Sequence, residues 1–129
     1  MWAIGAGIQP PPPDENAEAV SLIQLIATPE RFEGHMVRVI GVAQFGSEES
    51  ALYLHREDSD LLNVSNAVWL ATDKDYRSLK GAFVIVEGRF TAREHGHLGA
   101  FPGTIREIRR LQRMRTRADY QRLNSGAHK

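Results

Sequence analysis

Histidines are the residues of this chain whose chemistry and spacing come nearest to a metal-binding site. His95 and His97 are separated by one residue in a glycine-rich stretch, and His55 follows a short apolar run. A zinc site usually has three or four ligands, and the chain has no cysteine, so Asp58 or Glu94 would have to complete it. The sequence therefore offers His55, His95 and His97 only as an incomplete site. We expect no bound metal or cofactor, and we expect His97 to be a structural loop residue.

Other catalytic patterns are not found in the sequence. None of the seven serines stands in the glycine context of a hydrolase nucleophile, and there is neither a phosphate-binding loop with a lysine nor a dinucleotide fingerprint. Carboxylates occur in two polar loops, where solvated charge is the commoner explanation: Asp58, Asp60, Asp73 and Asp75. We therefore expect a protein that is not an enzyme.

Two aromatic residues are the best candidates for a binding surface. Tyr53 and Trp69 lie in apolar runs with period-two alternation and face away from the core leucines of those runs. Exposed rings of this kind can stack on bases or anchor a protein partner. Nearby acidic residues such as Glu48 and Glu49 repel phosphate and favour a basic protein partner. The alternative is that both rings pack beneath helices or loops.

The net charge of zero hides a division of the chain at Gly103. Residues 1–103 carry 8 basic against 14 acidic residues, whereas residues 104–129 carry 8 basic against 2 acidic residues. A basic segment of this kind can bind nucleic acid, or it can pair with the acidic part of its own chain. For the nucleic-acid alternative, the phosphate-binding candidates are Arg106, Arg109, Arg110, Arg113, Arg115 and Arg117.

Composition and length indicate one globular domain with extended ends. The chain has 129 residues, 42% of them hydrophobic and 25% charged, and no apolar run approaches the ~20 residues of a membrane helix. Residues 1–17 contain the run Pro10 to Pro13 and are predicted to be an extended linker. The first residues have no basic start and no long apolar stretch, so no intact signal peptide is expected and a cytoplasmic location is slightly favoured. Whether Met1–Gly7 is native or a processing remnant is left open.

Hydrophobic periodicity predicts a short helix followed by strands. Ser21 is a capping residue for an apolar helical stripe that ends near Pro29. Period-two alternation then predicts four strands, at residues 35–45, 51–55, 67–71 and 82–90. Gly41 would allow the first strand to coil sharply and serve both halves of a barrel. A helix is expected from Arg115 to Leu123.

The segment after Gly103 is ambiguous. Ile105, Ile108, Leu111 and Met114 recur every three residues, which is nearer to a helix than to a strand. A strand with one β-bulge between Ile105 and Ile108 would also place both isoleucines inward.

The order of these elements resembles the OB-fold, a mainly β, five-stranded Greek-key barrel, here with a short N-terminal helix and a C-terminal helix. More narrowly, the chain resembles a family of small bacterial OB-like proteins without an assigned activity. This resemblance covers roughly residues 20–112 and favours the bulged strand for residues 104–111. It depends on Ser21-Leu22, Pro29, Gly34, Val37-Arg38-Val39, Gly41, Ala51-Leu52-Tyr53-Leu54, Ala67-Val68-Trp69-Leu70, Val86-Glu87-Gly88, Gly96-His97-Leu98-Gly99 and Gly103-Thr104-Ile105.

The prediction is a linker at 1–17, a barrel domain at 18–114 and a basic C-terminal helix or tail at 115–129. We expect the barrel to be a binding module for a protein or peptide, and an inhibitory or immunity-type role would fit. The partner-binding candidates are Tyr53, Trp69, His55, His97 and Phe101, the last from the loop at 93–101. Single-stranded nucleic-acid binding is the alternative, and a metal-assisted enzyme is a distant third.

Overall fold

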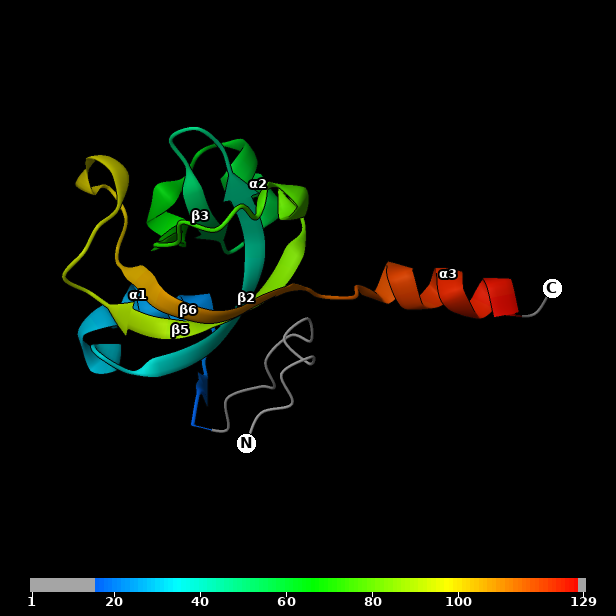
Figure 1. Cartoon of the computed structure of the whole chain (residues 1–129), viewed down its shortest axis with the longest axis horizontal. Helices are drawn as coiled ribbons and strands as arrows, with labels where there is room; N and C mark the ends of the chain where they lie inside the picture. The colour runs from blue at the N-terminus through cyan, green and yellow to red at the C-terminus, as the bar shows by residue number, and fades with distance from the viewer. Residues whose placement is uncertain (1–15, 128–129) are drawn as a thin grey trace, which may run out of the picture.

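The computed structural model of the protein describes residues 16–127 (Figure 1). The predicted proline-rich linker at 1–17 and the question about Met1–Gly7 therefore fall almost wholly outside the described residues. The strands are β1 (Glu18–Ala19), β2 (Met36–Phe45), β3 (Ser50–Tyr53), β4 (Ala67–Leu70), β5 (Phe83–Thr91) and β6 (Thr104–Arg113). The α-helices are α1 (Leu22–Ala27), α2 (Arg56–Asp60) and α3 (Arg117–Ala127), and the 3-10 turns are η2 (Pro29–Phe32), η3 (Val64–Asn66), η4 (Arg77–Leu79) and η5 (His97–Gly99).

Five of the strands close into a barrel. The sheet order is β1-β2-β3-β4-β6-β5, and β2 also pairs with β5, which closes the ring. Neighbouring barrel strands are antiparallel except for β4 and β6, which are parallel. This strand order is that of the OB-fold, so the predicted mainly β barrel with flanking helices is confirmed.

Strand β2 belongs to both halves of the barrel, as predicted, and Gly41 lies where its two pairings meet. Residues 36–42 pair with β5, and residues 42–45 pair with β3. A Cβ at Gly41 would lie 2.7 Å from the carbonyl oxygen of Tyr53 and 2.8 Å from Cγ of Leu52. A side chain at this position would prevent β3 from approaching so closely, so the packing of β3 against β2 requires glycine here. This is a different role from the sharp coiling that was predicted for Gly41.

The ambiguous segment after Gly103 is strand β6, and it is bulged. Glu87 pairs with Arg110 while Arg89 pairs with Arg106, so β6 has two more residues than β5 between these pairs. Glu107 has a φ of +50° within this bulge. The helix indicated by the spacing of three is therefore wrong, and the bulged strand favoured by the family resemblance is confirmed.

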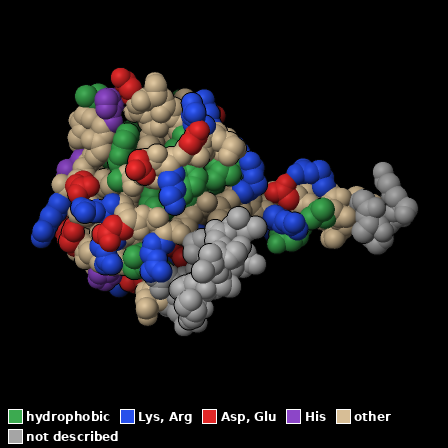
Figure 2. All heavy atoms as spheres, viewed as in Figure 1, with side chains coloured by type: hydrophobic (Ala, Val, Ile, Leu, Met, Phe, Trp, Pro, Cys, Tyr) green, Lys and Arg blue, Asp and Glu red, His purple; other side chains and the backbone are tan. Residues whose placement is uncertain are grey.

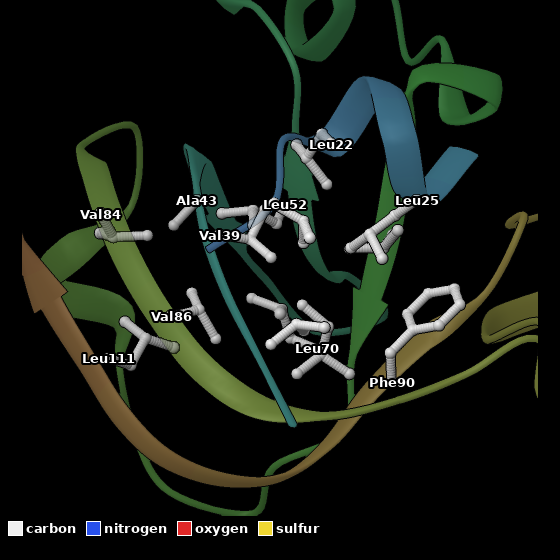
Figure 3. Close-up of a cluster of buried hydrophobic side chains, with 14 of the residues drawn as sticks. Leu22, Leu25, Val39, Ala43, Leu52, Leu70, Val84, Val86, Phe90 and Leu111 are labelled. Carbon is white, nitrogen blue, oxygen red and sulfur yellow. The ribbon is translucent and has the colours of Figure 1, made fainter. Parts of the chain in front are cut away.

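The main core fills the barrel and extends beneath α1 (Figure 3). Helix α1 starts with a capping box, in which Ser21 and Gln24 each bond to the backbone of the other. This start orients Leu22 and Leu25 toward the barrel interior. The inward side chains labelled in Figure 3 are Leu22, Leu25, Val39, Ala43, Leu52, Leu70, Val84, Val86, Phe90 and Leu111.

A buried carboxylate joins three strands on the outer surface of the barrel. Arg38, Glu87 and Arg110 are register partners across β2, β5 and β6. Oε2 of Glu87 accepts hydrogen bonds from Nε of Arg38 at 2.7 Å and from Nη1 of Arg110 at 3.2 Å. Because Glu87 is buried, these charge-assisted bonds lie in a setting that strengthens them.

Helix α3 extends away from the barrel at the end of β6 (Figure 1). Its first turn is capped by Thr116 and Asp119. The carboxylate of Asp119 accepts a bond from the Thr116 backbone N–H, and the Thr116 hydroxyl accepts one from the Asp119 N–H. The helix predicted for residues 115–123 thus exists, shifted toward the C-terminus.

Candidate functional site

A groove of about 510 Å³ lies at one end of the barrel, between three chain segments. The first segment is the turn between β2 and β3, the second is the stretch joining α2 to η3, and the third is the loop between β5 and β6. Its apolar lining comes mostly from the last two segments, and its acidic residues come from the first. The lining residues are Gly46, Ser47, Glu48, Glu49, Tyr53, Leu62, Val64, His97, Leu98, Ala100 and Phe101.

The segment that carries Leu62 is held in place by the buried side chain of Asp58. Its Oδ1 accepts hydrogen bonds from the side-chain amides of Asn63, at 3.2 Å, and Asn66, at 3.1 Å. The backbone between them turns sharply, and Leu62 has a φ of +53°. Leu62 is nevertheless 67% exposed, so this side chain faces the groove and solvent.

The loop between β5 and β6 is closed at its neck by His95 and Phe101. Nδ1 of His95 lies 2.8 Å from the Phe101 carbonyl oxygen, and the Phe101 N–H donates to the His95 carbonyl at 2.9 Å. Leu98 occupies the tip of the loop with a φ of +58° and is 87% exposed. Two hydrogen bonds thus close the base of the loop, and Leu98 lies exposed at the rim of the groove.

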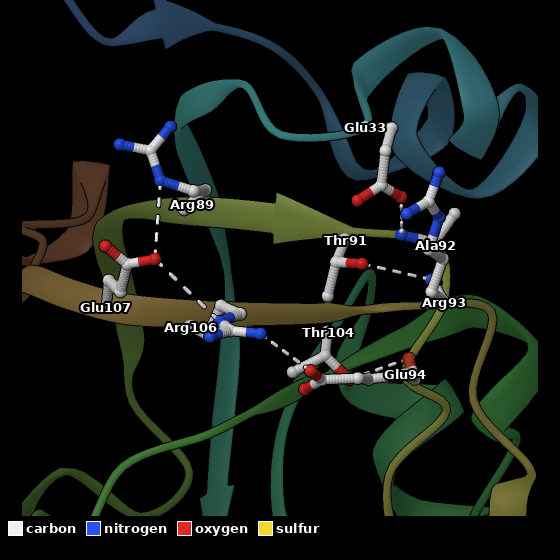
Figure 4. A network of polar contacts seen from close by, with 9 residues as sticks. All are labelled: Glu33, Arg89, Thr91, Ala92, Arg93, Glu94, Thr104, Arg106 and Glu107. Atoms are coloured by element: carbon white, nitrogen blue, oxygen red, sulfur yellow. Dashed lines mark hydrogen bonds and ion pairs between the residues drawn. The ribbon is translucent and has the colours of Figure 1, made fainter.

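A polar network anchors this loop to the ends of β5 and β6 (Figure 4). The hydroxyl of Thr104 donates to the Glu94 carbonyl oxygen at 2.8 Å. Nη1 of Arg106 lies 2.8 Å from Glu94 Oε2, and Nε of Arg106 lies 3.8 Å from Glu107 Oε2. On the other side, Glu33 accepts a hydrogen bond from the Ala92 N–H, which together with the Thr91 hydroxyl lowers the pKa of Glu33.

Tyr53 is not an exposed aromatic residue, as its side chain is 1% exposed. Its hydroxyl donates a 2.6 Å hydrogen bond to Oε2 of Glu49, at the floor of the groove. Burial, followed by this bond to a carboxylate, raises the pKa of Tyr53 well above its usual value. The expectation of an exposed Tyr53 is therefore wrong. The ring is buried, which is the alternative that the sequence left open.

Trp69 is partly buried beneath the loop between β5 and β6. Its ring meets that of Phe101 edge to face, with centroids 5.3 Å apart. Both belong to a second apolar cluster on the outer side of β2, β3 and β4, with Val42, Ala51, Tyr53, Ala67 and Phe101 as its buried members. The chain's own loop therefore covers the predicted aromatic surface, and the open surface is displaced to the groove beside it.

The three candidate histidines have different neighbours in the structure. Nδ1 of His55 lies 3.4 Å from Oδ2 of Asp58, and Nε2 of His97 lies 3.9 Å from Oε2 of Glu48. Among residues 16–127, no group of three or more His, Cys, Asp or Glu side chains is placed to hold a metal ion. The histidine of this loop whose ring lies within hydrogen-bond distance of a backbone carbonyl is His95, with Phe101, and not His97, which was expected to be the structural loop residue.

The six candidate arginines for phosphate binding do not form one open patch. Arg106 pairs with Glu94 and Glu107, and Arg110 pairs with the buried Glu87. Arg109 also has an interaction, whereas Arg113, Arg115 and Arg117 are exposed around the start of α3. The open positive charge is therefore concentrated at the end of the barrel from which α3 extends.

Sequence reasoning missed the two leucines that dominate the groove rim. Periodicity assigns Leu62 and Leu98 to no element, because each lies in a polar or glycine-rich connection. An apolar side chain in such a connection, as in Gly96-His97-Leu98-Gly99, was the available indication.

Comparison with known proteins adds little to this description. No protein-family model matches the sequence, and neither does any curated protein. A chain from the crystal structure of the S. pombe Stn1–Ten1 complex is similar in structure, with a TM-score of 0.49 and 14% sequence identity over 92% of this chain and 97% of that chain. The fold assignment depends on the strand order above and not on this similarity. No helix within residues 16–127 is long and apolar enough to cross a membrane.

Proposed function

We propose that the protein is a non-enzymatic binding module whose groove takes a basic segment with apolar side chains from a protein partner. The observation that carries this proposal is the conformation of Leu62 and Leu98. Both have left-handed backbone, which is unfavourable for leucine by about 1–2 kcal/mol, and both are exposed. Neither local conformation nor burial within the barrel explains a leucine at these positions. Contact with a partner does explain it.

The charge of the groove supports a basic partner. Glu48 lies on the rim with a side chain that is 78% exposed, and Glu49 lies beside it. Carboxylates at the rim attract cationic groups and repel phosphate, while the leucines supply the apolar contact. The expected ligand is therefore a peptide with an apolar pair flanked by Arg or Lys. Single-stranded nucleic acid suits this groove less well.

Trp69 provides a reporter for the test, because Phe101 joins its ring to the groove. In a Trp2→Phe background, Trp69 emission is followed while a ten-residue peptide with two leucines three positions apart and flanking arginines is added. We expect saturable binding that weakens in high salt. The same peptide with glutamates in place of the arginines should not bind.

Two variants separate binding at the groove from unspecific contact. Leu98→Gly removes an exposed rim side chain and should weaken binding at least tenfold. Ile23→Ala alters an exposed side chain on α1, outside the groove lining, and should leave it unchanged. Equal binding of the basic and acidic peptides, or equal loss in both variants, would refute the proposal.

A further inference from the structure

Helix α3 has an apolar face without cover among the described residues. Tyr120 and Leu123 lie three positions apart, on the same side of the helix, and are 55% and 52% exposed. The helix has 11 residues, and helices this short are marginal in water unless a partner surface covers one face. Figures 1 and 2 show α3 extending away from the barrel, which it adjoins only through its first turns. Helix α3 therefore has an apolar face that a partner surface can cover, and such a contact would stabilise the helix.

The charge of α3 is complementary to that of the groove. Arg115 lies over the Tyr120 ring, with 5.9 Å from Cζ to the ring centroid, and Arg117 is exposed nearby. Basic side chains thus accompany the apolar pair, as Figure 2 shows along α3. In the groove, Glu48 and the exposed leucines offer the opposite charge with an apolar surface.

From these features we infer that the groove of one copy binds α3 of a second copy. Tyr120 and Leu123 would contact Leu62 and Leu98, and the arginines would face Glu48. This inference depends on the proposed function, since it names the occupant of the same groove.

The chain's own α3 does not occupy its own groove in this structure. It extends away from the barrel (Figure 1), and none of its residues lines the groove. Its first turns instead line a separate hollow of about 300 Å³ with Arg56, Lys80 and Phe83. The groove is therefore open to α3 of a second copy.

Pairing between two α3 helices is disfavoured by charge. It would bring Arg115, Arg117 and Arg122 of both copies together, and Asp119 is the only acidic side chain of this segment. Binding of α3 to a groove is instead a contact between two different surfaces. Such head-to-tail contacts leave one free groove and one free helix, so they continue into rings or chains as concentration rises.

Sedimentation velocity of the full chain over a range of concentrations tests this inference. Two variants each disable one surface: Tyr120→Ser with Leu123→Ser on α3, and Leu98→Asn in the groove, where asparagine tolerates the left-handed backbone. We expect wild-type assemblies that grow with concentration and monomers for each variant alone. An equimolar mixture of the variants should form a dimer and nothing larger, because only one intact contact remains. The control Ile23→Ser should assemble like wild type.

Other outcomes would overturn the inference. A wild-type chain that stays monomeric at high concentration excludes it, and if the designed basic peptide still binds near Trp69, the proposed function survives that failure. Loss of assembly in the α3 variant but not in the groove variant would indicate pairing between helices. Assembly that persists in both variants would place the contact elsewhere. Circular dichroism of each variant establishes that the barrel remains folded.

Discussion

Gly96 lies directly against the indole ring of Trp69. A Cβ at this position would be 2.8 Å from the ring, and the backbone has a φ of +67°. Because the loop between β5 and β6 contacts Trp69 through this glycine, the two residues determine together how closely the loop covers the second apolar cluster.

The substitution Gly96→Ala should therefore displace the loop as well as strain the backbone. We expect a loss of more than about 2 kcal/mol in the free energy of unfolding, from strain and steric overlap together. Gly99→Ala is the matched control, since its φ is +66° but nothing lies within 4 Å of an added Cβ. It should cost only about 1 kcal/mol. Urea unfolding measures both, and a red shift of Trp69 emission should occur in the first variant alone.

Leu98→Gly should make the protein more stable while weakening partner binding. Leucine in left-handed backbone costs about 1–2 kcal/mol, and glycine removes this cost. The larger conformational entropy of glycine in the unfolded chain offsets roughly half of the gain in stability. Leu61→Gly is the control, because Leu61 is also largely exposed but has an ordinary φ of −94°. That change should destabilise the protein by about 0.5–1 kcal/mol. Urea midpoints that move in the same direction for both variants would contradict the assigned strain.

Tyr53 should make the protein sensitive to alkali. Its pKa is raised in the folded state, so the folded chain keeps a proton that the unfolded chain loses above about pH 10. The contribution is therefore fully present below that pH, and stability declines as the pH rises beyond it. Tyr53→Phe should flatten the decline above about pH 10, at a cost near neutral pH of about 1–2 kcal/mol for the lost hydrogen bond. Tyr120→Phe, at an exposed position, is the control and should retain the wild-type slope.

Glu87→Ala should be the most damaging change on the outer surface of the barrel. It removes the shared partner of Arg38 and Arg110, and breaking a buried pair costs about 3 kcal/mol at the lower end. Glu87→Gln retains the shape and an acceptor, so it should lose less. Asp75→Ala, which breaks the exposed pair with Arg77, is the comparison. If urea unfolding gives similar losses for Glu87→Ala and Asp75→Ala, the three-strand contact contributes little.

Sequence periodicity was sufficient for most of the barrel. Alternation located the four strands that contain Val39, Leu52, Leu70 and Val86, and these side chains do point inward. It failed at β6, because two additional residues in the bulge change a period of two into an apparent period of three. The family resemblance was needed there.

The candidate site was less predictable, for a physical reason. Alternation says on which side of a strand Tyr53 and Trp69 lie, but it does not say what covers that side. The cover depends on the loop between β5 and β6, whose shape follows from the positive φ of Gly96 and the paired bonds of His95 and Phe101. The positive φ of Leu62 and Leu98 is still harder to predict from the sequence, because leucine rarely adopts left-handed backbone.

The parallel pairing of β4 with β6 has a consequence for how the molecule opens. Only Trp69 with Thr104 and Leu70 with Ile105 are in register there, although the partners are 35 residues apart in the chain. Contacts of such long sequence separation are slow to form. A pairing of only two residue pairs also contributes little free energy to offset the entropy that is lost when the loop closes. We therefore expect this seam to assemble last in folding and to separate first in native-state fluctuations. Amide hydrogen exchange should show Trp69 and Ala71 exchanging before the amides of β2.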